Sequence, residues 1–125
     1  MDCFWLMGRS LKSAKAAGSS FETLVSNYLA LKVDDRIERR RLSGAFDKGD
    51  ISGVRIHGQR IVIECKNYGG KLSVGPWLNE TETERLNDSA LAGFVVAKRR
   101  GTTKPEEQIV LMTLEDCVAL ITGSR

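Results

Sequence analysis

Hydrophobic residues recur with a helical period near the start of the chain. Five of them are spaced three or four positions apart or adjacent: Phe21, Leu24, Val25, Tyr28 and Leu29. This spacing places them on one face of a helix. It predicts a helix that begins at Ser19 or Ser20, ends near Lys32 and buries that face.

The middle of the chain has the two-residue period of a strand instead. Residues 60–67 contain the run Ile-Val-Ile-Glu-Cys-Lys, whose side chains alternate between the two faces of a strand. Glu64 and Lys66 therefore project from one face, and Cys65 and its isoleucine neighbours project from the other. Because an unpaired buried charge is costly, two charges in an apolar strand indicate an ion pair or a functional site.

Asp50 stands at the start of a further predicted strand, which forms an antiparallel hairpin with this one. If residues 57–59 connect the two strands, Asp50 shares the face of Glu64 and Lys66. If only two residues connect them, the register shifts by one, and Asp50 lies on the opposite face unless a bulge compensates. A site that uses Asp50 therefore predicts a three-residue connection or a bulge, with Gly58 at positive φ.

The remaining elements complete an α/β fold. Strands are predicted at 37–42, 50–56, 92–98 and 108–112, and helices from Pro76 or Asn79 to about Leu91 and at 114–121. The longer of these helices has a sparse apolar stripe, formed by Trp77, Leu78, Leu86 and Ala90. A helix that connects two strands allows them to pair in parallel. The order of one helix, three strands, one helix, two strands and one helix predicts a mixed central β-sheet flanked by helices.

Composition and charge narrow the class of protein. The 125 residues suffice for one domain, and 42% hydrophobic with 28% charged residues is typical of a globular protein. Residues 1–60 hold 11 Lys/Arg against 7 Asp/Glu, whereas residues 61–125 hold 8 against 9. We expect a basic arm at residues 1–17, with an ordinary ragged terminus as the alternative, and a single domain at residues 18–125.

The basic surplus is suited to a polyanion such as DNA. Eleven basic residues are candidate phosphate contacts: Arg9, Lys12, Lys15, Arg39, Arg40, Arg41, Lys48, Lys71, Lys98, Arg99 and Arg100. A solvated charged face is the alternative for each cluster. The three cysteines have no CxxC spacing, which is typical of a reduced compartment and predicts a cytoplasmic protein. No run approaches the roughly 18 apolar residues of a membrane span, so we expect no membrane partner.

Two carboxylates on one strand face favour a hard divalent cation. Asp50, Glu64 and the backbone carbonyl of Cys65 offer the oxygen ligands that Mg²⁺ prefers, and Mn²⁺ is expected to substitute. Lys66 beside the metal can hold the attacking water or stabilise charge on phosphate in the transition state. The alternative is a structural Glu64–Lys66 ion pair, with Asp50 as a turn residue.

These residues resemble those of a known group of enzymes. Gly49-Asp50, followed after a hairpin by Ile63-Glu64-Cys65-Lys66, is similar to the motif of the PD-(D/E)XK nuclease superfamily. Together with residues 18–22, Gly-Ser-Ser-Phe-Glu, the chain most resembles the archaeal-type Holliday junction resolvases and related small phage nucleases. The resemblance covers roughly residues 18–120.

The resemblance implies a restriction-endonuclease-like fold and the activity of a metal-dependent DNA endonuclease. It also implies that the protein is a homodimer that cleaves branched DNA in recombination and repair. It implies that Glu22, Asp50 and Glu64 bind the metal and that Lys66 is catalytic. From the pattern alone, Glu22 instead completes a helix capping box with Ser19. A restriction-like or repair nuclease acting on linear, flap or single-stranded DNA is one alternative function, and a non-catalytic DNA-binding protein is another.

Two departures from the family pattern concern the site. Residue 49 is glycine where the family name has proline. The helix after the lysine often brings a glutamine in related nucleases, whereas this chain has Asn79, Glu80 and Thr83 in that region.

Overall fold

A mixed β-sheet of six strands is flanked by three helices in the computed structural model, which describes residues 11–40 and 48–125. The helices are α2 (Leu11–Lys32), α3 (Val74–Asn87) and α4 (Leu114–Thr122), with a 3₁₀ turn η1 (Pro105–Glu107). The strands are β1 (Glu38–Arg39), β2 (Ile51–Ser52), β3 (Arg55–Ile56), β4 (Gln59–Lys66), β5 (Ala92–Ala97) and β6 (Ile109–Leu111). Several expectations fall outside the described residues: those for Arg9 and Arg41, for the first ten residues of the basic arm, and for the end of the 37–42 strand. Along the described chain, no helix has the length and apolar character needed to cross a membrane.

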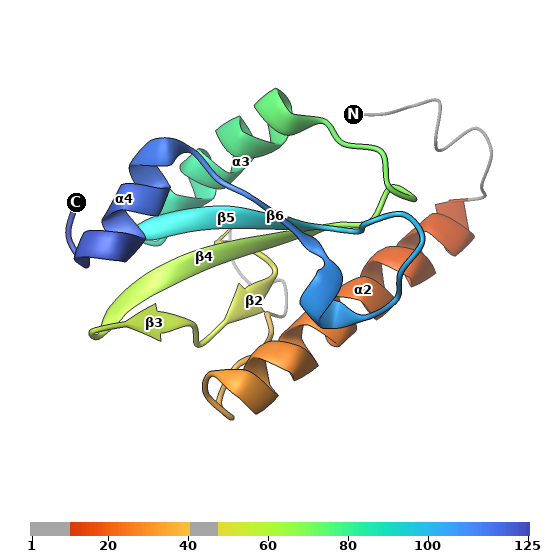
Figure 1. The fold of residues 1–125 in the computed structure, drawn as a ribbon, viewed down its shortest axis with the longest axis horizontal. Helices are drawn as coiled ribbons and strands as arrows, with labels where there is room; N and C mark the ends of the chain where they lie inside the picture. The colour runs from red at the N-terminus through yellow and green to blue at the C-terminus, as the bar shows by residue number, and fades with distance from the viewer. Residues whose placement is uncertain (1–10, 41–47) are drawn as a thin grey trace.

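The strand β4 is the centre of the sheet (Figure 1). The strands follow the order β1-β2-β4-β5-β6, and β3 pairs with the first part of β4. Among the strands that the structure describes, β4 and β5 are the one parallel pair, and α3 connects them. The predicted α/β class with a mixed sheet flanked by helices is therefore confirmed.

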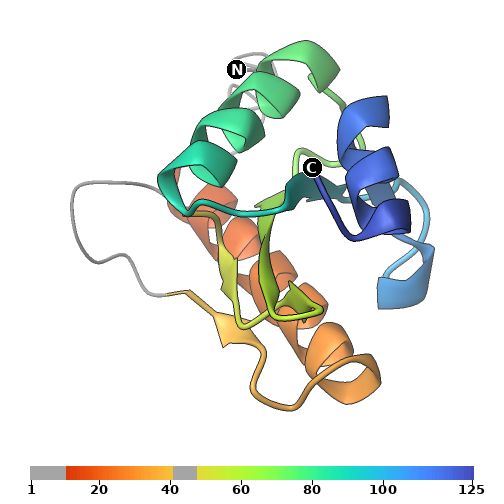
Figure 2. The ribbon, with the colours of Figure 1, turned by 90° about the vertical axis from the view of Figure 1, so that its left-hand side faces the viewer.

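The two faces of β4 meet different helices. Ile61 and Ile63 are buried and belong to one core with Phe21 and Val25 of α2. Burial of each such side chain contributes about 1.5–3 kcal/mol to stability. The opposite face of β4 lies against α3 (Figure 2). On this face Glu64 and Lys66 interact with Glu84 and Glu80 of α3.

Helix α2 begins at Leu11, so the predicted start at Ser19 or Ser20 is wrong. The part of the expected basic arm that the structure describes, residues 11–17, is the first part of this helix. Alanine, which has the highest helix propensity, occupies three of these positions and extends the helix through Gly18. The capping box is wrong for the same reason, because Glu22 lies in the middle of a 22-residue helix.

Helix α3 buries a polar face. Its buried residues are Trp77, Thr81 and Glu84, whereas Leu86 is 63% exposed. The predicted apolar stripe is therefore correct at Trp77 and wrong at Leu86. The Thr81 hydroxyl donates to the carbonyl of Trp77 at 2.9 Å, which satisfies it inside the protein.

The hairpin contains both a two-residue connection and a bulge. Ile56 pairs with Gln59, so only His57 and Gly58 connect β3 to β4, with φ of 50° and 78°. Positive φ at both positions is the geometry of a type I′ turn. The positive φ predicted at Gly58 is confirmed, and the three-residue alternative is excluded.

The register in which the hairpin pairs with β4 changes by one residue between β3 and β2, and this change compensates for the short turn. Arg55 pairs with Arg60, but Ile51 pairs with Ile63. Three residues on one strand thus face two on the other, which defines a bulge at Gly53, where φ is 90°. The bulge sets the register that places Asp50 beside Glu64.

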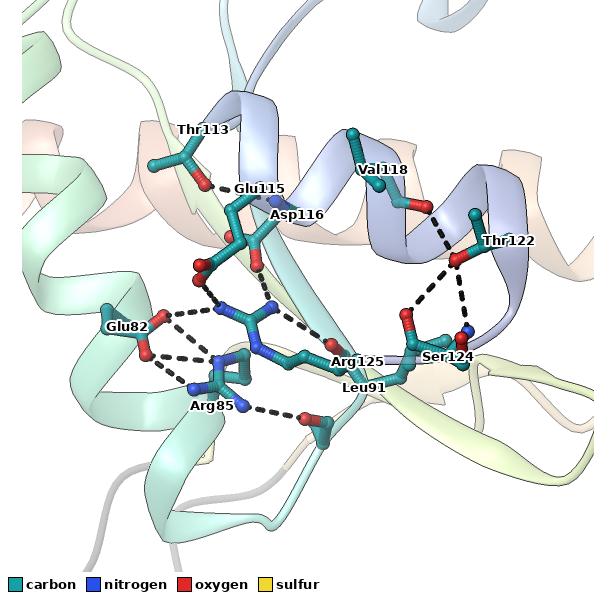
Figure 3. A network of polar contacts seen from close by, with 11 residues as sticks. Glu82, Arg85, Leu91, Thr113, Glu115, Asp116, Val118, Thr122, Ser124 and Arg125 are labelled. Atoms are coloured by element: carbon teal, nitrogen blue, oxygen red, sulfur yellow. Dashed lines mark hydrogen bonds and ion pairs between the residues drawn. The ribbon is translucent and has the colours of Figure 1, made fainter.

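A network of ion pairs fixes α3 and α4 near the end of the chain (Figure 3). Arg125 contacts the buried Asp116 and the exposed Glu115 of α4. It also lies 3.8 Å from Glu82 of α3, which binds Arg85. Asp116 is the buried member of this network, so the loss of Arg125 would leave a buried charge unpaired, whereas the half-exposed contact with Glu82 adds little stability.

The bulge glycine predicts a difference between two glycine substitutions. A Cβ at Gly53 would lie 3.0 Å from the Arg36 carbonyl oxygen, and the backbone is left-handed. We expect Gly53→Ala to reduce the free energy of unfolding by about 1–3 kcal/mol. Gly75 lies in α3 with no atom within 4 Å of a built Cβ, so Gly75→Ala is expected to stabilise by up to about 1 kcal/mol. Urea denaturation measures both, and equal effects would contradict a bulge that requires glycine.

Candidate active site

Asp50 is held by two hydrogen bonds to β4 and by one to Arg40, the residue after β1. Its amide donates to the carbonyl of Ile63 at 2.9 Å, and its carbonyl accepts from the amide of Arg40 at 2.7 Å. Its carboxylate Oδ2 accepts from the amide of Cys65 at 2.8 Å. The side chain of Asp50 therefore lies at the end of β4, next to Glu64.

Glycine at position 49 has a structural reason. Its φ is 92°, and a Cβ there would lie 2.9 Å from the Ile63 carbonyl oxygen. Proline fixes φ near −65° and therefore cannot adopt this conformation. Glycine at position 49 allows the backbone to approach β4 closely and to present Asp50 to it.

The four expected catalytic residues line one hollow of about 330 Å³. This carboxylate hollow is lined by Glu22, Asp50, Glu64, Cys65 and Lys66, together with residues of α2 and the end of β4. The residues come from α2, the start of β2 and β4. The structure thus brings together the residues that the sequence singled out.

Glu22 faces Asp50 from α2 and is bound by Arg39. The Nη2 of Arg39 lies 3.0 Å and its Nε 3.2 Å from Glu22 Oε2. Burial and the nearby charge of Asp50 raise the pKa of Glu22, although Arg39 opposes this shift. Glu22 is therefore a carboxylate of the hollow and not a helix cap.

Glu64 is the most perturbed carboxyl of the site. It is 5% exposed and lies against Glu84 of α3, which is 1% exposed. Burial, the hydrogen bond with Glu84 and the charge of Asp50 raise the pKa of Glu64 to about 11. Since two adjacent buried carboxylates cannot both ionise easily, we expect the pair to hold a proton at neutral pH in the absence of metal.

Lys66 is held as an ammonium group. Its Nζ lies 3.1 Å from both carboxylate oxygens of Glu80 and 3.7 Å from Glu64 Oε1. Burial disfavours the charged lysine, but the charges of Glu64 and Glu80 outweigh burial and raise the pKa of Lys66. In this arrangement Lys66 donates hydrogen bonds and positive charge and does not act as a base.

Three glutamates can hold a metal ion on the α3 side of β4. Glu64, Glu80 and Glu84 each place a carboxylate oxygen within 4.8 Å of the others. All three ligands are oxygens, which suits a hard cation. Glu64 thus belongs both to this cluster and to the expected set with Glu22 and Asp50. The thiol of Cys65 is buried, and burial raises its pKa, so its backbone carbonyl stays the predicted ligand.

Glu84 is the residue that the sequence analysis missed. The available signal is helical spacing. Thr81 lies about one turn after Trp77, and Glu84 lies about one turn after Thr81, so all three share the buried face. Sequence patterns do not point to Glu84, because glutamate is almost never fully buried unless it is paired. Glu80 has no predicted role, because the family's glutamine could not be carried over to it, to Asn79 or to Thr83.

Several expected DNA-binding residues surround the carboxylate hollow. A larger open hollow adjoins it and is lined by Lys15, Arg39 and Arg40 as well as by Glu22 and Asp50. Arg39 ends β1, Arg40 follows it, and Lys15 belongs to α2. Their positions give a basic margin on the β1 side of the carboxylates.

Other expected basic residues lie beyond the carboxyl ends of β4 and β5. The Lys98 amide donates to the Lys66 carbonyl at 2.9 Å, and the Arg100 Nε lies 3.4 Å from the Gly69 carbonyl oxygen. A Cβ at Gly70 would lie 2.8 Å from the Arg100 Cβ, so these two loops are in close contact. The other expected residues in the described part are Lys12, Lys48, Lys71 and Arg99, of which all but the half-buried Lys71 are exposed.

No protein-family model, curated protein or solved structure matches this chain. The observations that bear on function are therefore the fold class, the register of the hairpin and the arrangement of charged side chains. Among these, the convergence of Glu22, Asp50, Glu64 and Lys66 is the most specific.

The Glu64–Glu84 pair predicts how stability depends on pH without metal. Because the folded pKa of Glu64 is raised, this group stabilises the fold fully below pH 4.5, and the contribution is lost as pH rises toward 11. One proton changes the free energy of unfolding by up to about 1.4 kcal/mol per pH unit. Glu84→Gln removes one acid and can donate a hydrogen bond to ionised Glu64, so we expect a shallower loss between pH 5 and 9.

Urea denaturation in the presence of a chelator measures this difference. The matched control is Glu106→Gln, an exposed residue of η1 that should leave the pH slope unchanged. Equal slopes for Glu84→Gln and the wild type would contradict the shared proton.

Proposed function

We propose that this protein is a metal-dependent endodeoxyribonuclease that hydrolyses phosphodiester bonds. The observation that supports this best is the hairpin register, which sets Asp50 and Glu64 at one hollow with Glu22 and Lys66. The resemblance to the PD-(D/E)XK nucleases gives each of these residues a role. A restriction-endonuclease-like topology is part of the same proposal.

The donor set fits a hard divalent cation, which we propose is Mg²⁺, with Mn²⁺ able to replace it. Glu22, Asp50 and Glu64 would hold the ion, together with the Cys65 carbonyl. The raised pKa of Glu64 reflects in part the negative charge of Asp50, and a cation relieves such repulsion. Bound there, Mg²⁺ supplies Lewis acidity toward a phosphate oxygen and a water of lowered pKa.

The protein's own groups then orient the substrate and stabilise charge. Lys66 donates its ammonium hydrogens to a phosphate oxygen on which negative charge develops. Glu80 and Glu64 position that ammonium group. Glu84 positions Glu64 from α3 and excludes water from its buried side.

The proposed substrate is branched DNA, most specifically a four-way junction. The basic margin on the β1 side and the cluster beyond β5 provide phosphate contacts on two sides of the carboxylates, which supports backbone recognition over base readout. Affinity that rests on phosphate contacts falls as salt concentration rises.

Symmetric cleavage of a junction requires two active sites, so we propose that the protein acts as a homodimer. Leu114, Val118 and Ile121 form one exposed stripe of α4, with 79%, 47% and 78% exposure. Exposed apolar patches of this kind favour an interface. We assign this stripe to contact with a second copy.

A non-catalytic DNA-binding function is the second candidate. It is favoured by the ion pairs of the apo site, because Arg39 binds Glu22 and Glu80 binds Lys66. In that case the charges are structural, and neither metal binding nor cleavage is expected. A nuclease that acts on linear, flap or single-stranded DNA keeps the same site and differs in substrate.

The site assignment predicts variants that bind DNA but do not cleave it. Asp50→Asn removes a metal-binding charge, and Lys66→Gln removes the ammonium group, so each is expected to lower the cleavage rate at least about 100-fold. A labelled four-way junction and a matched linear duplex are incubated with Mg²⁺, with Mn²⁺ or with chelator. The junction is expected to be cleaved faster, and only with metal.

Glu106→Gln is the matched control and should cleave at the wild-type rate. Light scattering on the same preparations should give the mass of a dimer. Cleavage by Asp50→Asn at the wild-type rate would overturn the site, and faster cleavage of the linear duplex would assign the second substrate class.

A further inference from the structure

A second pocket opens beside the bulge of the hairpin, with a volume of about 260 Å³. Its charged lining comes from four basic residues and one acid: Arg40, Lys48, Arg55, Arg60 and Asp88. We call it the arginine pocket. The sequence singled out Arg40 and Lys48 as phosphate contacts, but not Arg55 or Arg60.

Arg60 is held in place by the end of α3. Its Nε and Nη2 donate to the carbonyl of Asp88 at 3.1 and 2.7 Å, and Nε lies 3.3 Å from Asp88 Oδ1. Asp88 is 6% exposed, whereas the Arg60 side chain is 45% exposed. The guanidinium is thus oriented by a buried partner while it remains accessible from the pocket.

Arg40 is only partly satisfied. Its Nη2 lies 4.0 Å from Asp88 Oδ2. Its buried Nε has no hydrogen-bond partner among residues 11–40 and 48–125. A buried donor without a partner costs about 1–3 kcal/mol, and an absent water or ion is a common explanation. Guanidinium groups match the geometry of phosphate oxygens.

The charge of the pocket is not balanced by its own lining. The contact between Arg60 and Asp88 is enough to explain a structural role at the end of α3. Lys48 and Arg55 also line the pocket, and both are exposed. Four cations against one carboxylate repel one another, which favours an anion between them.

The arginine pocket is continuous with the proposed active site through one residue. Arg40 lines both this pocket and the open hollow that contains Glu22 and Asp50. Its amide also donates to the Asp50 carbonyl at 2.7 Å. A nucleic-acid strand with one phosphate at the carboxylates can therefore place another phosphate of the same strand toward Arg40.

We propose that the arginine pocket binds a backbone phosphate of the DNA strand whose neighbouring phosphodiester lies at the carboxylate hollow. This inference rests on the proposed function and adds Arg55 and Arg60 to the substrate-binding residues. The ligand chemistry is a phosphate group, which either a DNA backbone or free inorganic phosphate can supply.

The test compares two sets of pocket variants with one control. Lys48→Gln with Arg55→Gln leaves the contacts of Asp88 intact, and Arg60→Gln is tested separately because it also loosens the end of α3. Lys104→Gln, at an exposed position before η1, removes one charge outside the pocket. Fluorescence anisotropy of labelled DNA over a salt series gives the affinity and its salt dependence. Thermal unfolding with and without inorganic phosphate gives anion binding, and calorimetry gives Mn²⁺ affinity.

In the double variant we expect DNA affinity to fall several-fold and the slope of log K against log salt to decrease by about 0.7–0.9 for each lost phosphate contact. Stabilisation by inorganic phosphate should disappear, whereas Mn²⁺ affinity should be unchanged. Lys104→Gln should behave as the wild type in all three measurements.

Two results would overturn the proposal. If the variants lose stabilisation by inorganic phosphate but keep the DNA salt slope, the pocket binds a free anion and not the strand. If neither quantity changes, the charges serve the fold alone.

The proposed function can fail separately. If the wild type binds DNA through this pocket but cleaves none with Mg²⁺ or Mn²⁺, the proposed function fails while the pocket remains a DNA-phosphate site.

Discussion

The register between β2 and β4 is the constraint on which the candidate site depends. A two-residue turn at His57 and Gly58 would by itself put Asp50 on the wrong face of the hairpin, and the bulge at Gly53 reverses this. Gly49 then lets the chain approach β4 closely enough for the Asp50 carboxylate to accept from the Cys65 amide. The positive φ angles of Gly49 and Gly53 together place the carboxylate of Asp50.

The second physical feature is the concentration of like charge under α3. Glu64 and Glu84 are both buried, and their proximity contributes to the raised pKa of Glu64. Such burial opposes stability unless a proton or a cation compensates. Three glutamates of this region are close enough to hold a metal ion, and natural proteins accept such a local cost in stability at functional sites. The site lowers the stability of the fold. The apolar core on the α2 side and the ion pairs of Arg125 offset this loss.

The sequence predicted the fold class from the periodicity of its strands and helices, and it predicted that Asp50 would join Glu64 and Lys66 from the hairpin register. It assigned Glu22 to the site only through the family resemblance, because the local pattern favoured a helix cap. It predicted that either a longer turn or a bulge was needed, but it did not locate Gly53, since several glycines near the hairpin could have accommodated the extra residue. The start of α2 was wrong because the Ser19–Glu22 pattern resembles a cap, whereas propensity favoured continuation through the preceding alanines. Glu84 was missed because its importance comes from contact with Glu64 across two elements, which no local pattern reports.

Paramagnetic broadening by Mn²⁺ tests most directly whether these carboxylates form one metal site. Backbone amide signals of ¹⁵N-labelled protein are followed as Mn²⁺ is added at less than one equivalent. The signals of residues around Glu22, Asp50 and Glu64 are expected to broaden first, those of α4 to stay sharp, and Asp50→Asn to abolish the selective effect. Broadening that is first seen at the exposed Asp35, or that is the same in Asp50→Asn, would contradict a metal site built by the hairpin register.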